Sequence, residues 1–281
     1  MDTQSTYARH IERVWTVEPQ QQSENHTVGM VLEPGNWALY DPFLFLAEDW
    51  FTEGTFDVHP HRGIETVTYV IEGRLNHYDN RFGEGQLAPG DVQWMTAGRG
   101  VIHQEDAAPG EIVHSLQLWV NLQSHNKMTE PRYQNLRGAD MPIRHVEGGT
   151  VRIFSGSSGG IESNTRNHVP VTMLEIQLEP GAKLIENLPG GYNGFIYILE
   201  GSGYFGENRQ LGNPKQVLWL GRHKDVAESF LEMTATTKLR ALLYAGQPVE
   251  EPVAAYGPFV MNTQAQIKQA FEDYASGKFG Q

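Results

Sequence analysis

The residues best suited to chemistry lie in two short clusters in the first half of the chain. One cluster contains His59 and His61, and the other contains His103 and Glu105. Because successive side chains of a strand point to opposite faces, residues two apart share a face. Two neighbouring strands would therefore bring three imidazoles and one carboxylate together. Burying such a group is costly unless its members are paired or bind a metal. The pattern favours a metal site over the alternative of exposed surface histidines and an exposed Glu105.

The types of ligand limit which metals could bind here but do not identify one metal. Imidazole and carboxylate ligands suit Fe(II), and they also suit Mn, Co, Ni, Cu and Zn. Raw affinity would favour Cu and Ni over Fe, so availability in the cell must decide. Four protein ligands leave two positions of an octahedron open. An organic anion and O2 could occupy these positions side by side.

None of the remaining histidines has a second histidine two residues away. We interpret them as exposed histidines or as hydrogen-bonded histidines of the core. They are His10, His26, His77, His114, His125, His145, His168 and His223.

The composition limits the class of protein. The chain has 281 residues, 39% of them hydrophobic, which suffices for two domains or one large β domain. It has no Cys, which excludes disulfides and thiolate metal ligands and fits a reducing compartment. The net charge is −13 and the chain has no basic run, so we expect no direct binding to nucleic acid. The sequence starts without a signal-peptide pattern and has no apolar run of membrane-spanning length, so we expect a cytoplasmic protein.

Short strand patterns surround the two clusters. Residues 65–71 are rich in β-branched and aromatic side chains and end at the turn signal Glu72-Gly73. Residues 92–95 and 115–122 continue the pattern, with Gly and Pro turns between strands. Such closely spaced short strands predict a barrel or a sandwich. Residues 124–144 are polar and lack periodicity, and we interpret them as the connection between two domains.

The second half of the chain repeats the strand pattern of the first. Residues 195–201 resemble 67–73, and residues 214–219 resemble 89–94. Extending these matches gives the counterparts of the four chemical residues, which are Asn187, Pro189, Glu228 and Phe230. The repeat therefore predicts two similar β-barrels, with a metal in the first only.

One helix is expected near the C-terminus. Thr263 and Gln266 form a capping-box pattern, and Gly277 supplies a stop signal. The apolar face at helical spacing consists of Ile267, Ala270, Phe271 and Tyr274. We expect this helix to pack on a barrel.

Longer motifs carry a resemblance to a known family. Residues 59–67 and 89–105 resemble the two signatures of the pirin family, within the cupin superfamily. Three further segments also resemble that family, namely 116–122, 130–133 and 257–263. The resemblance implies an all-β fold of two cupin-like (jelly-roll) barrels in tandem with a C-terminal helix. It implies an N-terminal metal-binding domain, 1–135, and a C-terminal domain without metal ligands, 136–281, that ends in the helix.

The resemblance also implies a cofactor and its ligands. Pirins are generally iron proteins, so Fe(II) is expected at His59, His61, His103 and Glu105, with other divalent transition metals as alternatives. In the general cupin pattern the acidic ligand would be Glu65, from which pirins depart. Glu65 is an even number of residues from His59 and His61, so on a continuous strand it would lie on the same face. We therefore expect Glu65 beside the ligands.

Similarity to pirins implies quercetin 2,3-dioxygenase activity. The substrates would be a flavonol and O2. The flavonol 3-hydroxyl would lose its proton and bind the metal, the heterocyclic ring would open, and carbon monoxide would leave. Glu105 is the candidate catalytic residue, as ligand and proton acceptor in turn. The expected pocket walls are Phe43, Phe56, Trp94 and Met95, for each of which packing in the core is the alternative role.

Two other functions stay open at the level of sequence. Pirins are also linked to transcriptional coregulation or, in a bacterial relative, to regulation of a metabolic enzyme, with the iron acting as a redox switch on a protein-binding surface. That function would require a protein partner and, in a eukaryote, a nuclear location as well. The third alternative is a β scaffold that a metal stabilises without chemistry.

Overall fold

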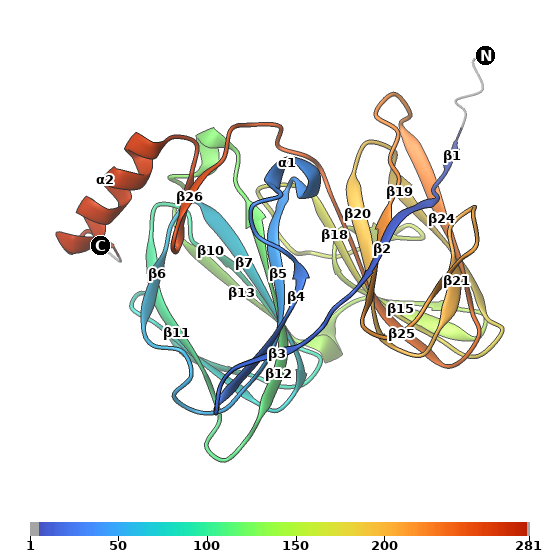
Figure 1. The fold of residues 1–281 in the computed structure, drawn as a ribbon, viewed down its shortest axis with the longest axis horizontal. Coiled ribbons are helices and arrows are strands. Elements are labelled where there is room, and N and C mark those ends of the chain that lie inside the picture. The colour runs from blue at the N-terminus through green and yellow to red at the C-terminus, as the bar shows by residue number, and fades with distance from the viewer. Residues whose placement is uncertain (1–5, 280–281) are drawn as a thin grey trace. The chain divides into compact units, whose positions relative to one another are not determined.

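The computed structural model describes residues 6–279, which form two compact units. The first barrel comprises residues 19–140 and 249–279, and the second barrel comprises residues 6–18 and 141–248 (Figure 1). This division corrects the predicted boundary after residue 135, because each end of the chain belongs to the barrel opposite to the one expected. The segment 124–144, expected as a connection, is instead largely ordered structure. It contains η1 (Ser124–Asn126), β13 (Arg132–Leu136), η2 (Gly138–Asp140) and β14 (Ile143–Val146).

The first barrel is built from two antiparallel sheets. The larger sheet has the order β13, β10 (Val92–Thr96), β7 (Ile64–Glu72), β12 (Val113–Asn121), β5 (Phe43–Phe51), β4 (His26–Leu32) and β3 (Gln20–Ser23). The smaller sheet has the order β6 (His59–His61), β11 (Val101–Ala107), β8 (Leu75–Asp79) and β9 (Gly83–Leu87). A short helix, α1 (Trp37–Tyr40), precedes β5. Every second residue of β11 is buried, and this alternation turns both His103 and Glu105 inward.

A tight turn separates β6 from β7. Gly63 lies in this turn with φ +82°, a conformation that side chains other than glycine rarely adopt. A Cβ atom on Gly63 would lie 1.9 Å from the carbonyl oxygen of Val260. The backbone of β27 (Phe259–Met261) therefore approaches the turn too closely for any side chain there. Because the turn interrupts the strand, the alternation of faces in β6 does not continue into β7.

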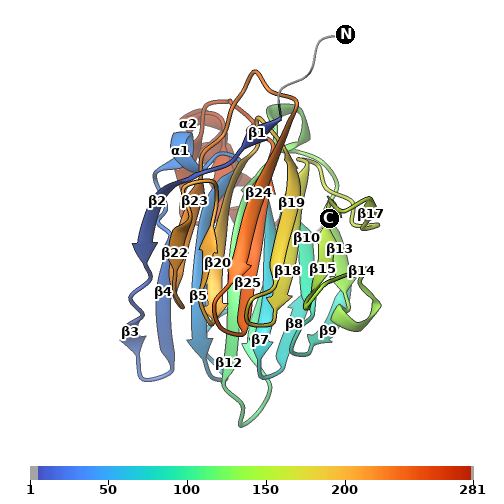
Figure 2. The same ribbon diagram turned by 90° about the vertical axis from the view of Figure 1, so that its right-hand side faces the viewer.

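The second barrel has a similar pair of sheets (Figure 2). The larger sheet has the order β14, β15 (Gly149–Ser155), β18 (Val171–Leu178), β25 (Leu239–Gly246), β20 (Asn193–Glu200), β23 (Gln216–Leu220) and β2 (Ile11–Thr16). The smaller sheet contains β1 (Tyr7–Ala8), β24 (Glu228–Ala235), β21 (Gly203–Phe205) and β22 (Gln210–Gly212), with β19 (Lys183–Pro189) also paired to β24. A small ribbon of β16 (Ser157–Ser158) and β17 (Ile161–Glu162) completes this unit.

Where the first barrel has its histidines, the interior of the second barrel has aliphatic side chains and one buried carboxyl, that of Glu186 on β19. Strands β19 and β24 pair with each other, as β6 and β11 do in the first barrel. Leu188 and Leu231 on these strands are buried in a large aliphatic cluster. Asn187 and Glu228 lie on the outer, exposed face, so the predicted correspondence with the ligand positions is one residue out of phase. A shift of one residue in a strand exchanges its two faces.

The chain's first strands belong to the second barrel. Strand β2 pairs with β23, and Arg9, which precedes β2, is fully buried. Its guanidinium donates hydrogen bonds to four backbone carbonyls, including that of Pro189 at 2.7 Å, and to Ser229 Oγ at 2.7 Å. Five guanidinium N–H donors suit such a set of acceptors. These bonds tie the segment before β2 into this unit.

The C-terminal helix belongs to the first barrel. Helix α2 (Gln264–Ala275) has the predicted capping box, in which Thr263 and Gln266 cap each other's backbone N–H groups. Ile267 and Ala270 are buried against β26 (Ala254–Tyr256) and β27, and Asp273 forms an ion pair with Arg62 at 2.9 Å. Figure 1 shows α2 beside β6 and β26. The predicted helix is confirmed, and its placement in the domain 136–281 is corrected. Within residues 6–279, no helix is long and apolar enough to cross a membrane.

Candidate metal centre

Three histidines converge inside the first barrel. Strand β6 pairs with β11 so that His59 lies opposite His103, and their Nε2 atoms are 3.0 Å apart. One ring nitrogen from each of His59, His61 and His103 lies within 4.8 Å of the others. Nε2 of the buried His61 finds no hydrogen-bond partner among residues 6–279. Within the described part of the chain, this is the one cluster of potential ligands with metal-site spacing.

The environment keeps two of these rings neutral. Burial and, to a smaller extent, the nearby His59 lower the pKa of His61 to about 3. Burial also lowers the pKa of His103 well below its ordinary value, with smaller effects from His61 and His59. A neutral imidazole has a free lone pair, which is the form that ligates metals. The donor set, its spacing and its protonation therefore fit a divalent transition metal.

A fourth histidine, His77, lies beside the ring nitrogen of His103 that faces away from His59. His77 on β8 is buried, and its Nε2 lies 3.4 Å from Nδ1 of His103. Because Nε2 of His103 faces His59, Nδ1 is the nitrogen left to face His77. Burial lowers the pKa of His77 to about 4, so its ring is neutral and one nitrogen accepts a hydrogen bond. The sequence interpretation gave His77 no role, because its partner lies on the neighbouring strand and not two residues away.

Glu105 lies in the same cavity but outside the group of three close ring nitrogens. Its carboxylate accepts hydrogen bonds from Thr68 Oγ1 at 2.8 Å and from Gln117 Nε2 at 2.5 Å. Burial raises the pKa of Glu105, and the hydrogen bond from Thr68, the charge of His59 and the hydrogen bond from Gln117 oppose this rise. Neither Thr68 nor Gln117 was among the predicted site residues. Alternation in the predicted strand 115–122 was the signal that placed Gln117 on one face with Ser115 and Trp119.

Glu65 does not lie beside the histidines. Its buried carboxylate accepts hydrogen bonds from Trp94 Nε1 at 3.0 Å and Thr96 Oγ1 at 2.7 Å. Glu65 was expected beside the ligands because residues 59, 61 and 65 would share one face of a continuous strand. That expectation is corrected, because the turn at Gly63 interrupts the alternation of faces. Thr68, three residues further along β7, is the side chain that faces the cavity.

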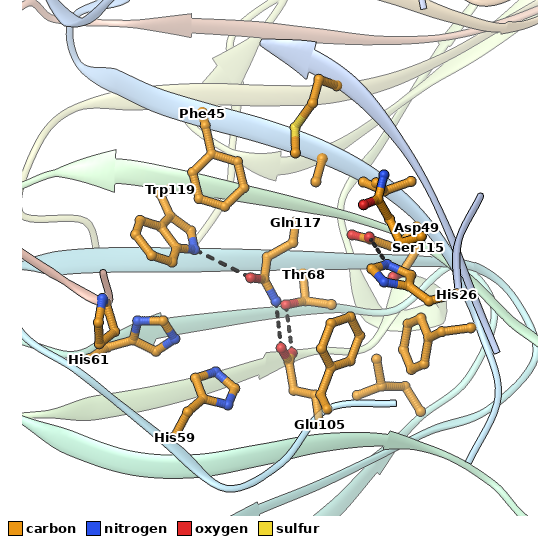
Figure 3. Close-up of a pocket in the computed structure, with 18 of the residues that line it drawn as sticks. His26, Phe45, Asp49, His59, His61, Thr68, Glu105, Ser115, Gln117 and Trp119 are labelled. Atoms are coloured by element: carbon orange, nitrogen blue, oxygen red, sulfur yellow. Dashed lines mark hydrogen bonds and ion pairs between the residues drawn. The ribbon is translucent and has the colours of Figure 1, made fainter. Parts of the chain in front are cut away.

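A cavity of about 560 Å³ opens beside the histidine cluster, with His59 and His61 in its lining (Figure 3). Its size lies in the range of small-molecule sites. The walls are mainly apolar and include Val28, Met30, Phe45, Ala47, Phe51, Phe56, Leu75 and Trp119. The Trp119 ring lies 4.9 Å from that of His61, which places this wall against the histidine cluster.

Only one of the four predicted wall residues lines this cavity. Phe56 does so, and its contact with a substrate stays a prediction. Phe43, Trp94 and Met95 are fully buried away from it, which corrects that expectation. Trp94 bonds to Glu65, and Met95 packs in a cluster with Leu44, Ile64, Ala97, Val101 and Val260. Both lie on β10, whose residues do not reach the cavity lining.

Comparisons with known proteins agree with this arrangement. Residues 23–120 match the family model described as Pirin, and residues 173–280 match the Pirin C-terminal cupin domain. Pirin-like protein 2 of Arabidopsis thaliana is 44% identical over 247 residues, which cover 86% of this chain and 76% of the relative. The chain belongs to the pirin family.

Solved structures support the same pirin fold along nearly the whole chain. A protein of Geobacillus kaustophilus is 61% identical with a TM-score of 0.87, covering 89% of this chain and 100% of that one. Quercetin 2,3-dioxygenase of Acinetobacter baumannii is 31% identical with a TM-score of 0.84, covering 97% and 99%. The predicted pirin fold of two cupin-type barrels and a C-terminal helix is therefore confirmed.

Proposed function

We propose that this protein is a metal-dependent dioxygenase that cleaves the heterocyclic ring of flavonols with O2, as a quercetin 2,3-dioxygenase does. The observation that carries the proposal is the convergence of three imidazoles, two of which line one end of a cavity with mainly apolar walls. The similarity to quercetin 2,3-dioxygenase of Acinetobacter baumannii supports it.

Four residues would hold the metal, which we propose is Fe(II). They are His59, His61 and His103, with Glu105 as the carboxylate ligand. A divalent metal bound there would supply Lewis acidity, which lowers the pKa of a hydroxyl group beside it. His77 would fix the orientation of His103, since a partner on the second ring nitrogen sets the tautomer of a ligating histidine.

Glu105 would act as the proton acceptor for the flavonol 3-hydroxyl. Thr68 and Gln117 each donate to one of its oxygens, and each oxygen keeps a further lone pair for a proton. Burial raises the pKa of the Glu105 carboxyl, which makes its carboxylate a stronger base than an exposed one. The aromatic walls Phe45, Phe51, Phe56 and Trp119 would bind the flat rings and exclude water from the reacting end.

Oxygen consumption tests the proposal. Protein loaded with Fe(II), or with Co, Ni or Mn, is mixed with quercetin under air, and loss of O2 and release of carbon monoxide are followed. We expect both in the native protein and neither in His103→Ala. His125→Ala is the matched control, because His125 is exposed and is not part of this cavity's lining, and it should retain full activity. Metal binding without oxygen uptake for every metal would reject the dioxygenase and favour a non-catalytic regulator.

A further inference from the structure

A second polar group lines the cavity and has no role in the chemistry described above. His26 Nε2 and Asp49 Oδ1 are 2.7 Å apart, and the two side chains keep 18% and 11% of their surface exposed. Both line the cavity, His26 from β4 and Asp49 from β5. Figure 3 shows this pair at the opposite end of the cavity from His59 and His61, with Ser115 beside it.

Strand register gives the separation of the two ends. On β12, Trp119 contacts the His61 ring, and Ser115 lies opposite Asp49 on β5. Trp119 and Ser115 are four residues apart, which corresponds to about 13 Å along a strand. The cavity therefore has room for an elongated ligand whose two ends meet different polar groups.

Between the two ends, the wall formed by β4, β5 and Phe56 is apolar and aromatic, and Thr68, Glu105 and Gln117 line the same stretch with polar groups. Phe45 and Ala47 on β5, Val28 and Met30 on β4, and Phe56 line this stretch. The Phe56 ring lies edge-on to the His26 ring, with 5.2 Å between their centroids. A ligand complementary to this surface is flat and aromatic in its middle and polar at both ends.

The chemistry of the pair indicates which polar group it would bind. The carboxylate of Asp49 has two oxygens, and only Oδ1 bonds to His26. An ionised carboxylate is an acceptor of hydrogen bonds and not a donor. Its natural ligand in a cavity is therefore a hydroxyl donor, and two adjacent hydroxyls would suit both the carboxylate and the imidazole.

We propose that the His26–Asp49 pair binds the hydroxyl groups on the outer ring of a polyphenol whose other end reaches the histidine cluster. The pair selects flavonols that carry adjacent hydroxyls on that ring over flavonols that lack them. This inference rests on the proposed function, because it assumes that the cavity holds a flavonol. His26 and Asp49 are binding residues and do not take part in ring cleavage.

Anaerobic binding measures this selectivity without turnover. Metal-loaded protein is titrated with quercetin, which has adjacent outer-ring hydroxyls, and with galangin, which differs from quercetin only in lacking them. We expect the native protein to bind quercetin about 10-fold more tightly, which corresponds to about 1.4 kcal/mol. His26→Phe and Asp49→Ala should each reduce the quercetin-to-galangin affinity ratio to about 1 and leave the affinity for galangin within about 3-fold. His26→Phe keeps a ring against Phe56, so it preserves the packing.

A neighbouring pair provides the matched control. His114 Nε2 and Glu48 Oε1 are 2.8 Å apart on β12 and β5, and neither residue lines the cavity. His114 stacks on Trp50 at 4.4 Å, so His114→Phe retains a ring there. This variant should keep the native preference for quercetin.

The possible outcomes separate the two proposals. A native protein that binds both flavonols equally, or a His26→Phe variant that keeps the native ratio, overturns the role of the pair while the dioxygenase proposal stands. Failure of the native protein to bind either flavonol overturns both. The binding role of His26 and Asp49 is supported if His26→Phe and Asp49→Ala lose the preference for quercetin while His114→Phe keeps it.

Discussion

At the scale of single residues, surroundings decide which histidines are suited to a metal. His61 and His103 are buried, and burial disfavours a charged ring. Their lone pairs are therefore available without competition from protons at neutral pH. The exposed His125 has the same side chain and none of this environment. The type and spacing of the residues predicted the cluster, but only the fold supplies its burial and its support from His77.

Replacement of His77 should weaken metal binding without removing a ligand. His77→Phe leaves a ring of similar size but leaves Nδ1 of His103 without its neighbour. Loss of such a partner typically lowers metal affinity by about 10–100-fold, and we expect a change of that order. Competition with a chromophoric chelator measures the affinity. His125→Phe should change nothing, and an unaltered affinity in His77→Phe would show that His103 needs no support.

At the scale of elements, turns decide which side chains share a face. Alternation along one strand correctly predicted that His103 and Glu105 point inward together. It failed for Glu65, because the positive φ of Gly63 interrupts the alternation between β6 and β7. It also could not identify Thr68 or His77, since their contacts with Glu105 and His103 depend on which strands become neighbours. The periodicity of a short segment does not predict which distant strands will pair with each other.

The close approach at Gly63 makes a specific stability prediction. Gly63→Ala would place a Cβ against the Val260 carbonyl, and we expect a destabilisation of about 3 kcal/mol or more. Gly54 has a similar φ, +79°, but its Cβ would meet nothing within 4 Å. Gly54→Ala should therefore show the conformational cost alone, about 1 kcal/mol. Urea unfolding of both variants tests this, and equal losses would mean that β27 moves aside easily.

At the scale of the whole molecule, two similar barrels differ in what fills them. The predicted repeat of strands agrees with the fold, but the predicted domain boundary was wrong at both ends. Sequence patterns did not indicate that Arg9 is bonded to carbonyls of the second barrel or that α2 packs on β27. Arg9 and Pro189, for example, are 180 positions apart in the sequence. Such contacts become visible only in three dimensions.

The second barrel carries a buried carboxyl that makes stability depend on pH. Burial raises the pKa of Glu186 to about 7, against a hydrogen bond from Ser158 and the charge of Arg144. Between about pH 4.5 and about pH 7 the folded state holds a proton that the unfolded state has lost, so stability falls as pH rises through this window. Above it, we expect the full loss, about 1–3 kcal/mol.

Glu186→Gln should remove this dependence. The variant should gain stability relative to the native protein by about 1–3 kcal/mol when the pH is raised from about 4.5 to about 8. Urea unfolding of the metal-free proteins at both pH values measures the difference. Glu162→Gln in the same barrel, at an exposed position, is the control and should behave as the native protein does. A constant difference between Glu186→Gln and the native protein would show that Glu186 is ionised throughout.

The most direct test of the central claim is an anomalous-scattering map from crystals of the Fe(II)-loaded protein. We predict one strong iron peak per chain, inside the first barrel and between the ring nitrogens of His59, His61 and His103, with Glu105 completing the ligand set. Iron bound elsewhere, or absent from these three rings at saturating metal, would contradict the account.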